Sequence, residues 1–256
     1  MSTHPHAPGA AAPRRSLVWL TVATAAALAV LIALGTWQVE RLHWKQALIA
    51  RVEERLASPP QPLPAPETWA DLTAEEVEYR PVSFTGRYDH SREIHVFIAL
   101  TQPKGPLRGQ GYFVMTPAML ADGRWVFVNR GFVPLDRKDA STRPESQIPG
   151  DVTIAGLMRP AEEPSWLSPK PDVSRNVWFV RDPARMAVAA GLDPARVAPF
   201  TVDAFAADLP GGLPQGGETV ITFSNNHLQY VVTWYGLAAA LAVVYVALAR
   251  KLLRRG

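Results

Sequence analysis

The residues best suited to chemistry lie together in one segment near the C-terminus. Asn225, Asn226 and His227 stand directly before an uncharged apolar run, and Tyr230 and Trp234 follow within it. His227, Tyr230 and Trp234 are spaced i, i+3 and i+7, so on a helix they share one face. A neutral imidazole backed by aromatic and apolar groups is suited to ligate haem iron. A second interpretation, in which His227 only caps the helix or forms a hydrogen bond at a membrane boundary, is favoured when residue types alone are considered.

Two further sets of residues are weaker candidates. Asn129-Arg130-Gly131 follows the apolar strand predicted at Trp125–Val128 and reads as a turn. Arg and Gly at the end of a buried strand can fix a loop or bind an anion, and a structural role is the simpler interpretation. His90 and His95 are five residues apart, which on a strand directs them to opposite faces. They are therefore expected to take structural or surface roles rather than to share a metal.

Composition excludes several classes of site. The chain has no cysteine, which rules out disulfides, thiolate catalysis and Cys-ligated zinc or iron–sulfur clusters. No paired acid and base, nucleophile or metal cluster converges at any spacing, so the protein is not expected to be an enzyme. The adjacent pair Glu162-Glu163 is expected to be solvated. The net charge is +3, but no dense Lys/Arg cluster is interleaved with aromatics, which argues against nucleic acid as a partner.

Two apolar runs, residues 17–38 and 224–249, are long enough to cross a lipid bilayer. A helix rises about 1.5 Å per residue, so about 20 residues cross the roughly 30 Å hydrocarbon core. The first run is longer than the apolar part of a cleaved signal peptide and does not end in a cleavage site of small residues. Both runs are therefore predicted to be transmembrane helices in the lipid bilayer.

Basic residues predict the orientation, because they are retained on the cytoplasmic side of a membrane. Arg250, Lys251, Arg254 and Arg255 follow the second run, whereas residues 197–227 contain no Lys or Arg. Both termini are therefore expected in the cytoplasm, as a tail of residues 1–16 and a basic tail of residues 250–256. The residues before the first run do not resemble a transit peptide, which favours a bacterial inner membrane over a mitochondrion.

The central region, residues 39–223, is predicted to be a periplasmic β-rich domain, either an antiparallel sheet or a small barrel. The first helix continues at helical spacing to about Leu56, and the proline-rich segment 58–66 ends it. Short runs typical of strands follow, separated by Gly and Pro. These runs are Val82–Tyr88, Ile94–Leu100, Gly111–Thr116, Trp125–Val133, Val152–Met158 and Asn176–Val180.

Two local signals predict further elements of the central region. Asp122-Gly123 predicts a turn between two of the strands, because glycine adopts positive φ without steric cost. Asp182–Ala190 predicts one short helix, with Asp182 as its N-cap and Gly191 as its end. The whole chain is thus expected to be an α+β membrane protein, with two terminal transmembrane helices flanking the β-rich domain.

Four blocks of the sequence resemble the family of Surfeit-locus protein one, a cytochrome c oxidase assembly factor. They are Gly35–Arg41 with Trp44-Lys45, Tyr79–Asp89, Gly111–Gly131, and Asn225–Tyr230 with Thr233–Gly236. The blocks span almost the whole chain, and their combination between two terminal helices is more specific than any one block.

The resemblance implies that the protein helps to build the haem–copper oxidase by handling haem a during its insertion into the largest subunit. Oxidase subunits and the enzymes that supply haem a would be its partners. The alternative function is a cofactor-free membrane scaffold that stabilises oxidase subunits during assembly.

The resemblance also implies a set of haem a-binding residues. His227 is the expected ligand of the haem iron, and Arg41, Lys45 or Arg130 is the expected partner of the haem propionates. The first helix would bring its residues to the same entrance as His227. The full set is His227, Tyr230, Trp234, Trp37, Gln38, Arg41, Lys45 and Arg130.

Overall fold

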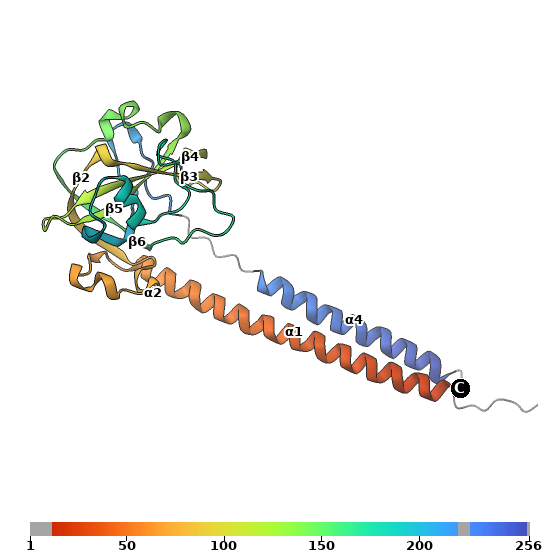
Figure 1. Ribbon diagram of the computed structural model, residues 1–256. Helices are drawn as coiled ribbons and strands as arrows, with labels where there is room; N and C mark the ends of the chain where they lie inside the picture. Colours follow the sequence, from red (N-terminus) through yellow and green to blue (C-terminus); the bar gives the residue numbers. More distant parts are fainter. Residues whose placement is uncertain (1–11, 220–225, 255–256) are drawn as a thin grey trace, which may run out of the picture. The chain divides into compact units, whose positions relative to one another are not determined.

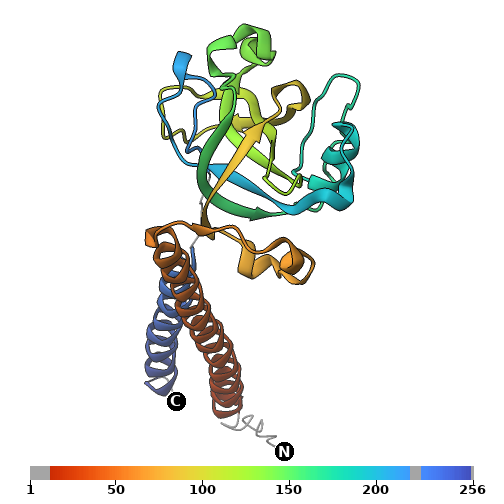
Figure 2. The same ribbon diagram turned by 90° about the vertical axis from the view of Figure 1, so that its left-hand side faces the viewer.

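The computed structural model describes residues 12–219 and 226–254, and these form two units (Figures 1 and 2). A helical unit consists of Met1–Arg51 and Thr222–Gly256, and a β unit consists of Val52–Ile221. The prediction of two apolar helices flanking a β-rich domain is confirmed. Asn225 and residues 1–11 of the predicted N-terminal tail lie outside the described residues.

The two long helices are α1, Ala12–Ala57, and α4, His227–Leu253. Both are long and apolar enough to cross a bilayer, and only 6% of the most apolar stretch of each is buried. A core helix of a soluble protein would be mostly buried instead. As predicted, α1 continues well past Trp37, and it ends at Ala57 because Pro59 and Pro60 follow.

Helices α1 and α4 run antiparallel, side by side (Figure 1). The hydroxyl of Thr21 lies 2.9 Å from that of Tyr245, and the hydroxyl of Thr36 lies 3.2 Å from that of Tyr235. Gly35 makes the close approach possible, because a Cβ there would lie 2.8 Å from the Tyr235 ring. A small residue and paired hydroxyls on the facing sides are typical of helices that associate in lipid.

The β unit contains seven strands joined in one sheet. They are β1 (Gln61–Pro62), β2 (Pro81–Tyr88), β3 (Ile94–Leu100), β4 (Gly109–Met119), β5 (Trp125–Pro134), β6 (Asp151–Pro160) and β7 (Val197–Ala204). Neighbouring strands form a ring in the order β2-β6-β7-β5-β4, and the pairs Arg87↔Met119 and Tyr88↔Ala118 close it. The sheet is therefore a five-stranded barrel, with β1 and β3 attached at its edges, which confirms the second of the two predicted forms.

Short helices complete the unit. The α-helices are α2 (Ala74–Val77) and α3 (Pro183–Ala189), and the 3-10 helices are η1 (Pro66–Asp71), η2 (His90–Arg92), η3 (Leu135–Arg137), η4 (Ala140–Thr142), η5 (Pro144–Ser146), η6 (Pro194–Arg196) and η7 (Pro210–Gly212). As predicted, the Asp182 carboxylate caps α3 by accepting from the N–H of Arg185, and Gly191 follows the helix with φ +66°. The predicted turn at Gly123 is also present, with φ +78°.

One strand prediction is wrong, and one strand was not predicted. Asn176–Val180 forms only isolated bridges, because Asn176 adopts a positive φ of 50° and the segment's one bridge to β3 is at Trp178. Strand β7 went unpredicted, since Pro199 and Asp203 interrupt its apolar pattern. Because β7 runs parallel to β5, the sheet is mixed rather than wholly antiparallel.

Apolar side chains fill the inside of the barrel and also cover part of its outer surface. Alternate residues of β2, β5, β6 and β7 meet inside the ring, among them Val82, Val126, Met158 and Phe200. Outside the ring, α3 and the segment around Trp178 cover β3, β4 and β5. The barrel thus holds its strand ends in fixed positions, and these ends carry the candidate site described below.

The predicted turn at Asn129–Gly131 is a β-bulge within β5, which continues to Pro134. Met115 pairs with Asn129 and Phe113 with Phe132, so one residue of β4 opposes two of β5. Gly131 has φ +127°, and a Cβ there would lie 2.1 Å from the carbonyl oxygen of Gln215. The bulge therefore requires glycine and re-aims the neighbouring Arg130.

We predict that Gly131→Ala lowers the free energy of unfolding of the β unit by about 3 kcal/mol. The backbone strain of a positive φ and the collision of the new Cβ with Gln215 both contribute to this loss. Thermal unfolding of the full chain followed by circular dichroism measures the loss. Gly150→Ala is the matched control, because Gly150 has φ +84° with nothing near its missing Cβ. Equal losses in the two variants would contradict the assignment of the collision with Gln215.

Candidate functional site

The helical unit places His227 against Gln38 of α1. His227 is the first residue of α4 and is partly buried, while Gln38 is 8% exposed on the side of α1 that faces α4. The Nδ1 atom of His227 lies 2.8 Å from Oε1 of Gln38. The interpretation of His227 as a residue that forms a hydrogen bond therefore holds, and the partner is a side chain of the other helix.

This contact determines which ring nitrogen of His227 can bind a ligand. The Gln38 oxygen only accepts hydrogen bonds, so Nδ1 of His227 carries the proton and donates it. The lone pair of the neutral ring is then on Nε2. A histidine whose other nitrogen donates to an oxygen is the usual form of a metal ligand, because the bond fixes both tautomer and ring orientation. The geometry thus suits His227 to ligate iron.

The other predicted residues of the helical unit surround this pair unevenly. Trp234 lies on the half-buried side of α4, whereas Tyr230 is 50% exposed. Trp37 is 51% exposed, and the guanidinium of Arg41 lies 6.0 Å from its ring centroid. Arg41 also lies 5.0 Å from the ring centroid of Trp44, and Lys45 follows on α1. Of the predicted residues, Gln38 and His227 contact each other across the two helices.

A second polar site lies at one end of the barrel, around the carboxylate of Glu93. Glu93 is 7% exposed, Arg130 is 3% exposed and Arg143 is 2% exposed. Arg143 pairs with Glu93 through Nη2, and Nη1 of Arg130 lies 3.6 Å from Oε1 of the same carboxylate. Arg130 also donates to the Ser146 carbonyl and contacts Nδ1 of His90 at 3.2 Å. Residues from η2, β5 and the segment between β5 and β6 thus meet at one carboxylate.

Burial and charge act in opposite directions on the groups of this cluster. Burial raises the pKa of Glu93, but hydrogen bonds from His90 and Arg143 and the charges of both arginines outweigh it and lower the pKa to about 2. Burial lowers the pKa of His95 to about 4, despite the opposing charge of Glu93. At neutral pH, Glu93 is therefore ionised and His95 is neutral.

The prediction that His90 and His95 point apart is wrong. His90 lies in η2 rather than on a strand, so the two-residue alternation does not apply to it. Nδ1 of His90 lies 3.5 Å from Glu93, and Nε2 of His95 lies 3.8 Å from it. Of the two expected roles, the structural one applies, since the side chains are only 12% and 8% exposed. Among the described residues, no group of His, Asp and Glu has the arrangement of a metal site.

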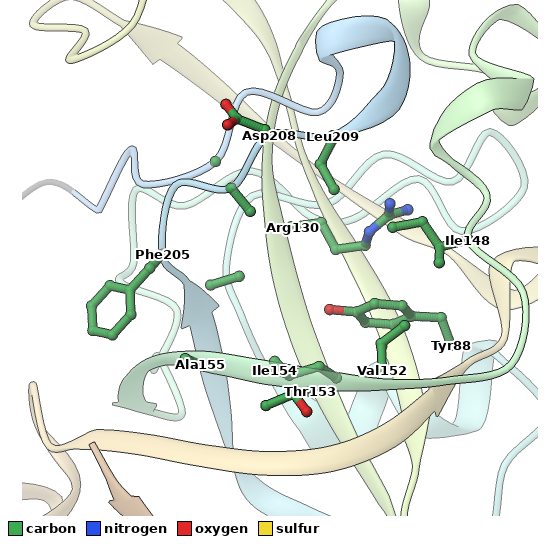
Figure 3. A pocket seen from close by; sticks show the side chains of 13 residues that line it. Tyr88, Arg130, Ile148, Val152, Thr153, Ile154, Ala155, Phe205, Asp208 and Leu209 are labelled. Carbon is green, nitrogen blue, oxygen red and sulfur yellow. The ribbon is translucent and has the colours of Figure 1, made fainter. Parts of the chain in front are cut away.

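A pocket opens beside this cluster (Figure 3). Its volume is about 290 Å³, and apolar side chains of β6 and the loops form much of its wall. The Arg130 guanidinium stacks over the Tyr88 ring at 5.0 Å, and both residues line the pocket. Burial raises the pKa of the Tyr88 hydroxyl to about 12, so it remains a hydrogen-bond donor.

A separate ion cluster joins β5, β7 and the segment before α3. Arg181 pairs with both Glu162 and Asp203, and Asp203 also accepts from the amide of Asn129 at 3.0 Å. Glu162 was expected to be solvated, and its side chain is 37% exposed, but its carboxylate also pairs with Arg181. Sequence reasoning did not identify Glu93, Arg143 or Arg181 as members of buried ion clusters. Each lies in a polar stretch without periodicity, and only the fold brings its partner near.

Comparison with known proteins places the chain among close relatives. A sequence model described as the SURF1 family matches residues 25–239. Surfeit locus protein 1 of Rattus norvegicus is 37% identical over 89% of this chain and 74% of its own length. The proteins of the same name from Xenopus tropicalis and Homo sapiens are both 39% identical, over 81% and 83% of this chain and 68% and 71% of their own lengths.

We predict that the β unit loses stability as the pH falls from 6.5 to about 4. In this range His95 binds a proton in the unfolded chain but not in the folded protein, where its pKa is about 4. The loss should reach roughly 3 kcal/mol. Below pH 4.5 the stability falls further, because the unfolded chain protonates Glu93 more readily than the folded protein, in which the pKa of Glu93 is about 2.

Unfolding midpoints of the full chain at a series of pH values measure both losses. His95→Gln should flatten the curve between pH 6.5 and 4 and leave the lower part unchanged, while His43→Gln, at an exposed histidine of α1, should change neither. An unaltered slope in His95→Gln would show that another group causes the upper transition.

Proposed function

The chain belongs to the SURF1 family, and on that premise we propose that it is an assembly factor for haem–copper cytochrome c oxidase. In this proposal it binds haem a as cargo and assists its insertion into the largest subunit, without chemical turnover. Oxidase subunits and the enzymes that supply haem a are then its partners.

The contact between His227 and Gln38 is the observation that supports haem a as the cargo. It leaves Nε2 of His227 as an unprotonated nitrogen on a ring whose orientation Gln38 fixes. Haem iron takes such an imidazole as an axial ligand. Trp37, Tyr230 and Trp234 would offer aromatic surface to the macrocycle, and exposure of the first two leaves them accessible. A single protein ligand also suits a cargo that must be released.

We assign the haem propionates to Arg41 and Lys45. The Arg41 guanidinium lies near the rings of Trp37 and Trp44, and a guanidinium can pair with carboxylates such as propionates through its N–H groups. Arg130 lies in the β unit, where Glu93 and the Ser146 carbonyl engage its guanidinium. It is therefore left out of this assignment.

The proposal also places α1 and α4 across a bacterial inner membrane, with both termini in the cytoplasm and the β unit in the periplasm. The antiparallel pairing supports this, because it brings the N-terminal end of α1 and the C-terminal end of α4 to the same side. Arg250, Lys251 and Arg254 lie at that end. Basic residues at the cytoplasmic ends of both spans match the charge rule for membrane orientation.

We predict that the full chain, purified from cells that make haem a, carries a haem chromophore and that His227→Ala loses most of it. The absorption spectrum per mole of protein measures this. His43→Ala, at an exposed histidine of α1, should keep the chromophore. A colourless His227→Ala protein that still supports normal oxidase assembly would favour the cofactor-free scaffold instead.

We also predict that Gln38→Leu weakens haem retention roughly tenfold, because the ring of His227 loses the bond that fixes its tautomer. Competition for haem by a soluble haem-binding protein measures the retention. Gln46→Leu is the matched control, since Gln46 is an exposed glutamine of the same helix. Equal retention in Gln38→Leu and wild type would exclude a positioning role for Gln38.

A further inference from the structure

The Glu93 cluster carries more buried positive than negative charge. Arg130 and Arg143 share the single carboxylate of Glu93. The cluster around Arg181 shows the contrasting case, in which one buried arginine has two carboxylates, Glu162 and Asp203. Burying a charge without an equal partner is costly, so the first cluster favours an additional anion.

The electrostatic environment of the two arginines differs accordingly. Burial lowers the pKa of Arg130. Tyr88 and the single carboxylate of Glu93 oppose this effect and the charge of Arg143 adds to it, so the pKa stays lowered. Burial acts on Arg181 as well, but the charges of Asp203 and Glu162 outweigh it and raise the pKa. The partners of Arg181 therefore compensate for the burial of its charge, and those of Arg130 do not.

The pocket of about 290 Å³ lies where an anion could reach Arg130. The hydroxyl of Tyr88 points toward the centre of the lining residues, and the Arg130 guanidinium lies over the Tyr88 ring (Figure 3). The contacts of Arg130 with His90, Glu93 and Ser146 engage Nη1 and Nη2, and none of them involves Nε. Two donors of different residues thus border the same space.

The rest of the wall is apolar. Val152 and Ile154 of β6 lie beneath the donors, and Ile148 and Leu209 flank them (Figure 3). An apolar cavity of about 150 Å³ holds a benzene molecule, so this pocket has room for about ten heavy atoms. A strongly hydrated anion such as phosphate would leave the apolar wall in contact with water. A carboxylate on a hydrocarbon chain would cover it.

We propose that this pocket binds an aliphatic monocarboxylate, with Arg130 and the Tyr88 hydroxyl donating to the carboxylate and the walls of β6 covering the chain. Asp208 at the rim opposes the charge of such a ligand and sets its affinity. The inference does not use His227, so it stands or falls separately from the binding of haem a.

The edge of β6 offers a way to tell whether the carboxylate belongs to a free acid or to the C-terminus of a peptide. Pairing of β6 with β7 begins at Gly156, and the carbonyl of Ala155 accepts from the N–H of Phe205. Backbone groups of alternate residues point to the same side, so those of Thr153 face the pocket that Thr153 also lines. A peptide that ends in a carboxylate can add hydrogen bonds there, which a free acid cannot.

Titration of the full chain in nanodiscs of neutral lipid with hexanoate labelled at its carboxyl carbon tests the proposal by ligand-observed NMR. Empty nanodiscs correct for partition into lipid. Hexanoate should bind, and hexylammonium of the same length should bind roughly tenfold more weakly or not at all. Equal binding of the cation, or no saturable binding of hexanoate, would overturn the proposal.

Variants at the exposed mouth test the location without disturbing the buried cluster. Ala207→Trp should block binding, whereas Ala195→Trp, at an exposed alanine outside the pocket, should not. Asp208→Asn should tighten hexanoate binding about threefold, because a nearby exposed negative charge is removed. Unchanged binding in Ala207→Trp would place hexanoate elsewhere and refute the site.

A last comparison uses acetyl-Val-Thr-Leu with a free C-terminal carboxylate and the same peptide as an amide. Tighter binding of the free peptide than of hexanoate supports a protein segment as the source, and weaker binding supports a free acid. Binding of the amide as tight as that of the acid would contradict carboxylate recognition altogether.

Discussion

The carboxylate of Glu93 holds together the end of the barrel that carries the pocket. It is buried, so it must be paired, and its partners come from the bulge of β5, from η2 and from the segment between β5 and β6. Arg143 also donates to the carbonyls of Arg137 and Lys138, which ties that segment to the same point. The position of Arg130 beside the pocket is thus a consequence of satisfying one buried charge.

The need of polar side chains for partners also governs the helical unit. Thr36 and Gln38 are polar residues of α1, and each meets a polar side chain of α4. In the proposed membrane location, polar groups would have few other partners, so these pairs would set the register of the two helices. The register in turn determines that His227 donates through Nδ1. A structural hydrogen bond therefore prepares the ring nitrogen that the proposed function uses.

The two units carry different kinds of recognition. The helical unit offers one nitrogen ligand among exposed aromatic side chains, which suits a cargo held by a single coordinate bond. The β unit offers buried positive charge beside an apolar pocket, which suits an acid with a hydrocarbon part. An assembly factor that performs no chemistry would need both properties, because it has to hold a cofactor and also recognise what receives or accompanies it.

Residue patterns by themselves determined the elements with strong local signals. The two apolar helices, the strand at Ile94–Leu100 and the capped helix after Asp182 follow from runs, alternation and capping, which depend on neighbouring residues. Spacing also singled out His227. Its partner Gln38 is 189 residues away, and only the packing of α1 on α4 made that pair. The meeting of His90 and His95 at Glu93 and the parallel strand β7 were likewise decided by tertiary structure, because the partners of a buried polar group are chosen by the fold and not by chain order.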